Sequence, residues 1–247
     1  MIDRAHLKLG RLAPTHEQRA KALPLARFVT RPLPPAPVEF HGAAGAPLGL
    51  FGNDRYGDCT FAALANYRAI CAHHEGAPFP TTTEDVVSAY LAFTGGADEG
   101  AVETEVLSAA RDTGVLLGGA EPWMLATWVR VSLRDFEMCH SLISIFWALY
   151  LGVELPIAAQ SETIWTTPVR QNGIYAPRSW GGHALLWSGY DGKGLNDLPT
   201  WGAEQPAEDG WLRAYCDEAY LILDADRAKV IGVDWDALMA AQAAVLP

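Results

Sequence analysis

The sequence has few cysteines, few charged residues and no apolar segment long enough to cross a bilayer. Its 247 residues include 4 Cys, which lack both the close pairing of a zinc site and the density of a disulfide scaffold. The longest apolar run, 142–153, is too short for a membrane span. The N-terminus has no apolar core of a signal peptide. We therefore expect reduced thiols in a soluble cytoplasmic protein.

Two further kinds of motif are missing from the sequence. No glycine-rich phosphate loop and no cluster of metal ligands is visible, so we expect no cofactor and no bound metal. The formal net charge of -11 disfavours nucleic acid and anionic membranes as partners. The remaining class of partner is a peptide or protein.

The composition is that of a globular chain. Hydrophobic residues make up 50% of the sequence and charged residues 19%, enough to bury a sizeable core. Residues 1–47 are predicted to form an N-terminal arm that ends in a proline-rich stretch, 31–42, where extended backbone is favoured. Thr15 is a candidate cap for a short helix over 15–25. We expect the arm to run along the back of the body as a belt, anchored by Phe28, Val38 and Phe40, rather than across Cys59 as a plug.

Residues 48–247 are predicted to form one domain in which helices come first and strands later. This segregation favours an α+β fold, with a helical lobe over about 48–152 and a sheet lobe over about 153–247. After a helix that starts near Cys59, the expected helices are 81–93 (capped by Thr81 with Glu84), 103–113, 133–151 and 233–246. The expected strands are an extended piece between Trp123 and Trp128, 155–159, 183–191, and one or two within 210–223.

Cys59 lies where a loop runs into a helix, within 53–67. A thiol at a helix N-terminus faces unpaired backbone N–H groups and the positive end of the helix dipole, which favours the nucleophilic thiolate. Asp58 acts against this, because a neighbouring carboxylate raises the pKa of a thiol. A reactive Cys59 therefore requires a histidine partner.

His183 is the best candidate for that partner. It follows Gly181 and Gly182 at the start of a predicted buried strand, where a substrate chain has room beside the ring. Its ordinary pKa allows proton exchange near neutrality. Paired with Cys59, it would accept the thiol proton and later protonate the leaving amine.

Three motifs together resemble the papain-like (C1-type) cysteine peptidases. They are NDRYGDCT at 53–60, GHA at 182–184 and TWG at 200–202. The resemblance is greatest to a divergent bacterial and phage branch with an NDRxGDC motif and a late DEAY. It implies a helical N-terminal lobe and an antiparallel sheet C-terminal lobe with the active-site cleft between them.

The resemblance also implies residue roles. Cys59 would be the nucleophile and His183 the general base and acid, and Asn53 matches the oxyanion-hole Gln that lies six residues before the nucleophile. Asn is one methylene shorter than Gln. Pro199 stands where the family has its triad Asn, so Asn196, Thr200 or a backbone carbonyl is left to orient the imidazole. The predicted substrate-binding residues flank these groups: Gly57, Asp58, Trp180, Gly181, Gly182 and Trp201.

The acidic residues near the motifs have simpler interpretations. Asp98, Glu99, Glu103 and Glu105 are expected to form a solvated loop and helix start rather than a cation site. Asp217 and Glu218 alternate across a strand, which predicts that they do not face one site together.

Three functions remain open from the sequence. The favoured one is a cysteine hydrolase that cleaves a peptide or amide bond. The second is a cell-wall amidase or endopeptidase of the CHAP or NlpC/P60 kind, although those domains are shorter. The third is a catalytically inactive papain-like scaffold in a bacterial or phage assembly, which would allow a virion-associated location.

Overall fold

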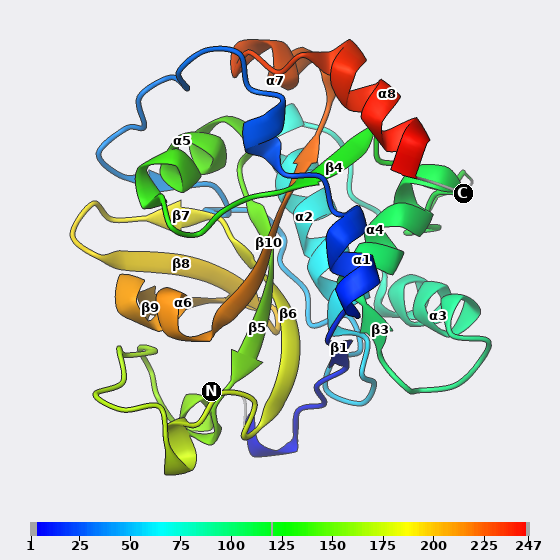
Figure 1. Ribbon diagram of the computed structural model, residues 1–247. Coiled ribbons are helices and arrows are strands. Elements are labelled where there is room, and N and C mark those ends of the chain that lie inside the picture. The colour runs from blue at the N-terminus through cyan, green and yellow to red at the C-terminus, as the bar shows by residue number, and fades with distance from the viewer. Residues whose placement is uncertain (1–3, 120, 246–247) are drawn as a thin grey trace.

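The computed structural model describes residues 4–119 and 121–245, and it has the predicted α+β architecture (Figure 1). The helices are α1 (His16–Lys21), α2 (Cys59–Glu75), α3 (Thr83–Phe93), α4 (Glu103–Asp112), α5 (Phe136–Phe146), α6 (Asp209–Tyr215), α7 (Ala225–Val230) and α8 (Trp235–Val245). The strands are β1 (Arg11–Leu12), β2 (Phe40–His41), β3 (Ala101–Val102), β4 (Thr127–Arg130), β5 (Leu149–Leu155), β6 (Gly181–Trp187), β7 (Gly189–Tyr190), β8 (Leu195–Thr200), β9 (Ala203–Glu208) and β10 (Cys216–Leu223).

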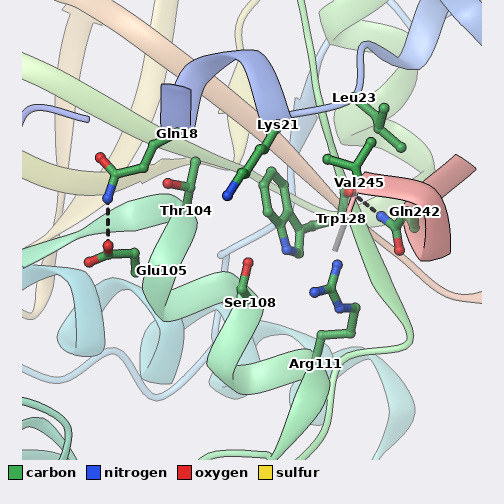
Figure 2. Close-up of a pocket in the computed structure, with 10 residues that line it drawn as sticks. All are labelled: Gln18, Lys21, Leu23, Thr104, Glu105, Ser108, Arg111, Trp128, Gln242 and Val245. Atoms are coloured by element: carbon green, nitrogen blue, oxygen red, sulfur yellow. Dashed lines mark hydrogen bonds between the residues drawn. The ribbon is translucent and has the colours of Figure 1, made fainter. Parts of the chain in front are cut away.

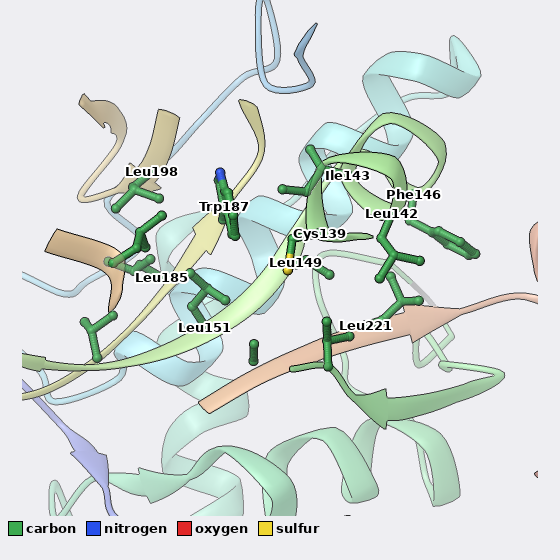
Figure 3. Packing of buried hydrophobic residues seen from close by; sticks show 14 of the residues in the cluster. Cys139, Leu142, Ile143, Phe146, Leu149, Leu151, Leu185, Trp187, Leu198 and Leu221 are labelled. Atoms are coloured by element: carbon green, nitrogen blue, oxygen red, sulfur yellow. The ribbon is translucent and has the colours of Figure 1, made fainter. Parts of the chain in front are cut away.

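A four-stranded antiparallel sheet in the order β4-β10-β5-β6 forms the centre of the molecule. Its strands are buried on both faces. In β6, Leu185 and Trp187 belong to a core cluster that includes α5, whereas Ala184 and Leu186 belong to the cluster around α2. Figure 3 shows the first cluster, in which side chains of α5 lie over β5, β6 and β10. A second antiparallel sheet, β2-β7-β8-β9, contacts β6 through β8.

The N-terminal arm is buried in part. Phe28 is an anchor as expected, whereas most of the proline-rich stretch is exposed and Val38, at 84% exposed, is not an anchor. Strand β1 pairs in parallel with β3, and the buried side chains of Leu23, Leu25 and Phe28 join the core clusters or pack beside them. In the proline-rich stretch, the carbonyl oxygen of Pro34 accepts a hydrogen bond from Ser141 on α5. This stretch therefore follows the outside of the body, as a belt does.

Several elements agree with the sequence patterns. Thr15 caps α1 in a capping box with Gln18. The Cys59 helix, α4 and α8 lie where helices were expected, although residue 246 is outside the described residues. Helix α3 is capped by Thr82 with Asp85, one residue later than predicted.

Two sequence-based assignments were wrong. The apolar stretch 133–151, predicted as one helix, ends as a helix at Phe146, because Trp147 adopts a left-handed conformation and β5 starts at Leu149. The segment 155–159 contains a 3-10 turn instead of a strand. In 210–223 one expected strand is present, as β10, and it follows the helix α6. A strand buried on both faces has no alternating pattern, so periodicity cannot distinguish it from a buried helix.

The predicted lobe boundary near residue 152 falls inside β5. Strand β4 also precedes that boundary but belongs to the central sheet. Among the described residues, no helix is long and apolar enough to span a membrane.

We expect the hydrogen bond between Tyr150 and α2 to matter for stability. Tyr150 lies on β5 and its hydroxyl donates to the carbonyl oxygen of Thr60 at 2.7 Å, inside the core. Tyr150→Phe should lower the free energy of unfolding by about 1–2 kcal/mol in urea titration, because a buried hydrogen bond is lost. Tyr175→Phe, at a half-exposed position, should change it by less than about 0.5 kcal/mol. Equal values for the two variants would contradict the assigned role.

Candidate active site

Cys59 is the first residue of α2, with Asp58 as the N-cap. The helix begins here because the chain leaves a series of turns at 51–57 and enters an apolar segment that packs on the central sheet. Only 1% of Cys59 is exposed. The backbone N–H groups of Ala184 and Gly10 lie near its thiol and lower its pKa. The thiol therefore lies close to β6, beside the residue that follows His183.

His183 lies on β6 and is also buried, with 1% of it exposed. Its Nε2 lies 2.7 Å from Thr200 Oγ1, and its ring stacks on Trp201 with 4.5 Å between centroids. The imidazole is thus held on one edge and one face. Its Nδ1 has no hydrogen-bond partner among the described residues. The expected direct hydrogen bond between Cys59 and His183 is absent in this conformation.

Trp201 reaches the histidine from a strained turn. The β8–β9 hairpin closes through Trp201 and Gly202, with φ values of 49° and 75°. Two successive positive φ values are typical of a type I′ turn, in which a bulky first residue is disfavoured by about 1 kcal/mol or more. The strain is offset by packing, because the Trp201 indole stacks on His183 and lies 5.6 Å from the Trp180 ring.

Residues 9–11 of the arm lie across Cys59, and we call them the covering segment. On one side they press against Gly57 and Gly100: a Cβ at Gly10 would lie 1.7 Å from the Gly57 carbonyl oxygen. On the other side they press against Gly181 and Gly182: a Cβ at Gly182 would lie 2.4 Å from the Arg11 carbonyl oxygen. Only glycine permits such close approach of two backbones, so both walls of the cleft are shaped to this segment.

The prediction of a belt was therefore correct for the proline-rich stretch and wrong for the start of the arm. Residues 9–11 cover Cys59, and they lie well before the proline-rich stretch in the sequence. No periodicity or turn signal distinguishes Gly10 and Arg11 from the rest of the arm.

Arg11 anchors the covering segment in a buried cluster of charges. Its Nε lies 3.0 Å from Glu103 on α4, and its guanidinium also pairs with Asp217 at 2.8 Å and with Glu218 on β10. The side chains of Arg11 and Glu103 are fully buried. Two expectations are corrected here. Glu103 is not solvated, and Asp217 and Glu218 do meet one group, because a bulge between Cys216 and Glu218 breaks the alternation of β10.

Asn53 lies beside the arm, next to the covering segment. Its Nδ2 donates to the carbonyl oxygens of Lys8, at 3.1 Å, and Tyr56, at 3.2 Å. The first of these acceptors is a backbone carbonyl of the arm. An amide that donates to a carbonyl at this point can donate equally to the carbonyl of another extended chain.

Burial makes the covered site electrically neutral. It raises the pKa of the Cys59 thiol to about 12, because the loss of hydration outweighs the backbone N–H groups of Ala184 and Gly10, which lower this pKa; Asp58 and Glu103 add smaller increases. It lowers the pKa of His183 to about 3, with Arg11 adding to the effect. At neutral pH the covered protein therefore holds a thiol and a neutral imidazole, which is an unreactive combination.

Asp58 is buried beneath the cysteine. Burial raises the pKa of its carboxyl to about 8, so most of it is protonated at pH 7. Asp58 still raises the pKa of the Cys59 thiol, as expected, but by less than burial does. Its role as a substrate contact stays a prediction, and its side chain is buried in this conformation.

Asn196 does not contact His183. Its Nδ2 donates to the Ala207 carbonyl oxygen and to Asp209, within the second sheet. The prediction of Asn196 as the third member of a triad was wrong, and Thr200, four residues later on the same strand, occupies the place beside Nε2.

The remaining predicted site residues line the cleft. Gly57, Trp180, Gly181 and Gly182 border a cavity of about 430 Å³, together with residues 8–12 of the arm. Asp98 holds its rim, since its carboxylate accepts hydrogen bonds from the Gly57 N–H and from Tyr90 and pairs with Lys8. Asp98 is exposed, as expected, and it also holds the loop in place. No group of three or more metal-ligating side chains occurs within residues 4–119 and 121–245.

Solved structures share this arrangement of lobes. Xylellain, a cysteine protease from Xylella fastidiosa, superposes with a TM-score of 0.63 at 14% identity, over 88% of this chain and 96% of that one. A digestive procathepsin L from Tenebrio molitor larval midgut gives 0.61 at 11% identity, over 90% and 78%. Procathepsin B from Trypanosoma congolense gives 0.58 at 11% identity, over 89% and 87%.

The chain has the papain-like fold. The sequence by contrast matches no family model, and no curated protein matches it. At these identities the papain-like likeness concerns the fold, and the roles of individual residues rest on the geometry of this chain.

The charge cluster predicts how the covering segment is released. Arg11→Gln leaves Glu103 and Glu218 buried without their cation, and breaking such a pair costs about 3–5 kcal/mol. The segment should therefore undock, and Cys59 should be alkylated by iodoacetamide at least tenfold faster, as measured by peptide mass spectrometry. Arg19→Gln is the matched control, because it removes only an exposed contact with the same Asp217. Unchanged alkylation in Arg11→Gln would show that the ion pairs do not hold the segment.

Asp58 predicts a pH dependence of stability. Its pKa is 3.8 in the unfolded chain and about 8 in the folded one, so between these values the folded state retains a proton that the unfolded chain releases. Stability from this group is present below pH 4 and is lost as pH rises toward 8. Asp58→Asn does not titrate, so its unfolding free energy relative to the parent should rise by a few kcal/mol between pH 4 and 8. Asp226→Asn, at an exposed position, should show no such trend.

Proposed function

We propose that this protein is a papain-like cysteine hydrolase that cleaves a peptide or amide bond. The observation that supports the proposal most is the meeting of α2 and β6. The Cys59 thiol, at the N-terminus of α2, lies close enough to the residue after His183 for that backbone N–H to lower its pKa, while Thr200 holds Nε2 of the histidine. Nucleophile, base and orienting group thus come from three elements at one point.

The covering segment must leave before any substrate is bound. Residues 9–11 occupy the space beside the sulfur, and their departure admits water and removes much of the burial that sets both pKa values. The pKa of Cys59 then falls and that of His183 rises. The two groups approach the range in which a proton passes from thiol to imidazole.

The proposed reaction uses His183 Nδ1, which has no hydrogen-bond partner among the described residues. When Thr200 Oγ1 accepts the Nε2 proton, Nδ1 carries the lone pair and acts as general base. The Cys59 thiol gives its proton to Nδ1 and the sulfur attacks the substrate carbonyl carbon. The imidazolium then returns the proton to the departing amine, which leaves an acyl-enzyme. A water molecule, deprotonated by the same nitrogen, hydrolyses the thioester and frees the carboxylic acid and the thiol.

The oxyanion of each tetrahedral intermediate is assigned to two donors. One is the backbone N–H of Cys59, at the positive end of α2. The other is Asn53 Nδ2, which in the covered state donates to the Lys8 carbonyl. The substrate class that fits is an extended peptide, since the cleft walls already accommodate an extended backbone between pairs of glycines.

A second candidate is a papain-like scaffold without catalysis. It is favoured by the filled cleft, by the absence of a direct Cys59–His183 hydrogen bond within the described residues, and by Pro199 at the position of the family's Asn. Its partner would be a component of a bacterial or phage assembly. The cell-wall amidase alternative gains no support from the cleft.

Peptide hydrolysis distinguishes the cysteine hydrolase from the inactive scaffold. The Arg11→Gln protein should hydrolyse a fluorogenic peptide library, and adding Cys59→Ala should abolish this activity. Cys71→Ala, Cys139→Ala and Cys216→Ala should retain it. Adding His183→Ala should lower kcat by about 10²–10⁴-fold, and Thr200→Val by about tenfold with little change in KM. Alkylation of Cys59 without hydrolysis of any library member would establish the scaffold.

A further inference from the structure

A second pocket lies on the arm side of the molecule, where α1 meets α4, β4 and α8 (Figure 2). Its volume is about 210 Å³, and it shares no lining residue with the cleft cavity. The arm contributes Lys21 and Leu23, and the body contributes Ser108, Arg111, Trp128 and Val245. Any molecule bound here touches both parts of the chain.

Several hydrogen-bond donors converge at one end of the pocket. The Trp128 side chain is 95% buried, and its indole N–H has no acceptor among the described residues. Figure 2 shows the Lys21 ammonium, the Arg111 guanidinium and the Ser108 hydroxyl directed toward the same space. Arg111 engages Asp112 through Nε and one terminal nitrogen, so its other terminal nitrogen is available. A cluster of donors with two cations is suited to an anionic oxygen pair.

The other end of the pocket is apolar. Leu23, Val245 and the Trp128 ring form its walls. A dry cavity of about 150 Å³ is known to hold benzene, so about 210 Å³ accommodates a six-membered ring with a carboxylate attached. The acidic group at the rim, Glu105, accepts a hydrogen bond from Gln18 and is not turned toward the donors.

We propose that this pocket binds a small organic carboxylate with an apolar body, and that the bound ligand holds the arm against the body. Lys21 lies on α1, ten residues after the covering segment ends at Arg11. A ligand that contacts Lys21 together with Arg111 and Trp128 binds only when α1 is docked. By linkage, it stabilises the state in which Cys59 is covered. The ligand site does not depend on whether Cys59 is catalytic.

Benzoate is the probe for the carboxylate, and benzamide is its neutral counterpart of the same shape. In titration calorimetry on the full chain, benzoate should bind at least tenfold more tightly than benzamide. In a ¹H–¹⁵N spectrum, benzoate should shift one indole N–H resonance, and that resonance should be missing in Trp128→Phe. Equal affinity for the two compounds, or an unshifted Trp128 resonance, would overturn the carboxylate site.

Substitutions in the pocket test which side chains bind the carboxylate. Lys21→Gln and Trp128→Phe should each weaken benzoate binding by about tenfold, because each removes a hydrogen bond to a charged group. Lys229→Gln is the matched control: Lys21 pairs with exposed Glu17 one helical turn away, and Lys229 pairs likewise with exposed Asp226, outside the pocket. Equal weakening by Lys21→Gln and Lys229→Gln would mean that the effect is general electrostatics, which contradicts the proposal.

Alkylation of Cys59 tests the link to the covering segment. In saturating benzoate the rate should fall by a factor that approaches 1 + [benzoate]/Kd, and Lys21→Gln should remove this protection. Benzoate that binds without slowing alkylation would overturn the clamping role. Catalytic turnover is not measured here, so failure of this test and failure of the proposed hydrolysis are distinguishable.

Discussion

The buried guanidinium of Arg11 is the interaction on which the observed state of the protein depends. It joins the N-terminal arm to α4 through Glu103 and to β10 through Asp217 and Glu218. A buried charge is tolerable only when it is paired, so the arm, helix and strand are constrained together. The backbone around Arg11 is thereby constrained to run across Cys59. There it lies between two walls of the cleft, each of which contains two glycines.

The same packing determines the electrostatics of the site. Covering the cleft removes water from Cys59 and His183, and the loss of hydration drives their pKa values apart, toward about 12 and about 3. A pair of neutral groups is stable in the interior and chemically inactive. The arrangement that favours folding is therefore the reverse of the one that favours nucleophilic attack, and movement of one extended segment separates the two.

Much of the fold class was predictable from patterns, while the central strands were not. Helix α2 has apolar residues at helical spacing and starts at a turn, so its place was readable from local signals. Strand β5 is apolar on both faces because α2 covers one side and α5 the other, which makes its sequence resemble a buried helix. Helix α5 ends just before Trp147, which adopts a left-handed conformation. No glycine or proline stands there to indicate a helix end in the sequence.

Local chemistry in the sequence, together with the resemblance to papain-like peptidases, made Cys59 and His183 the candidates, because a thiol at a helix start and a histidine behind two glycines are visible in adjacent residues. The register of β8 places Thr200, and not Asn196, beside His183. A bulge in β10 lets both Asp217 and Glu218 contact Arg11. His183 and Thr200 are 17 positions apart and Arg11 and Glu218 are 207 apart. These contacts arise from strand pairing and burial, which no local pattern contains, and so tertiary structure alone decided what covers the cysteine.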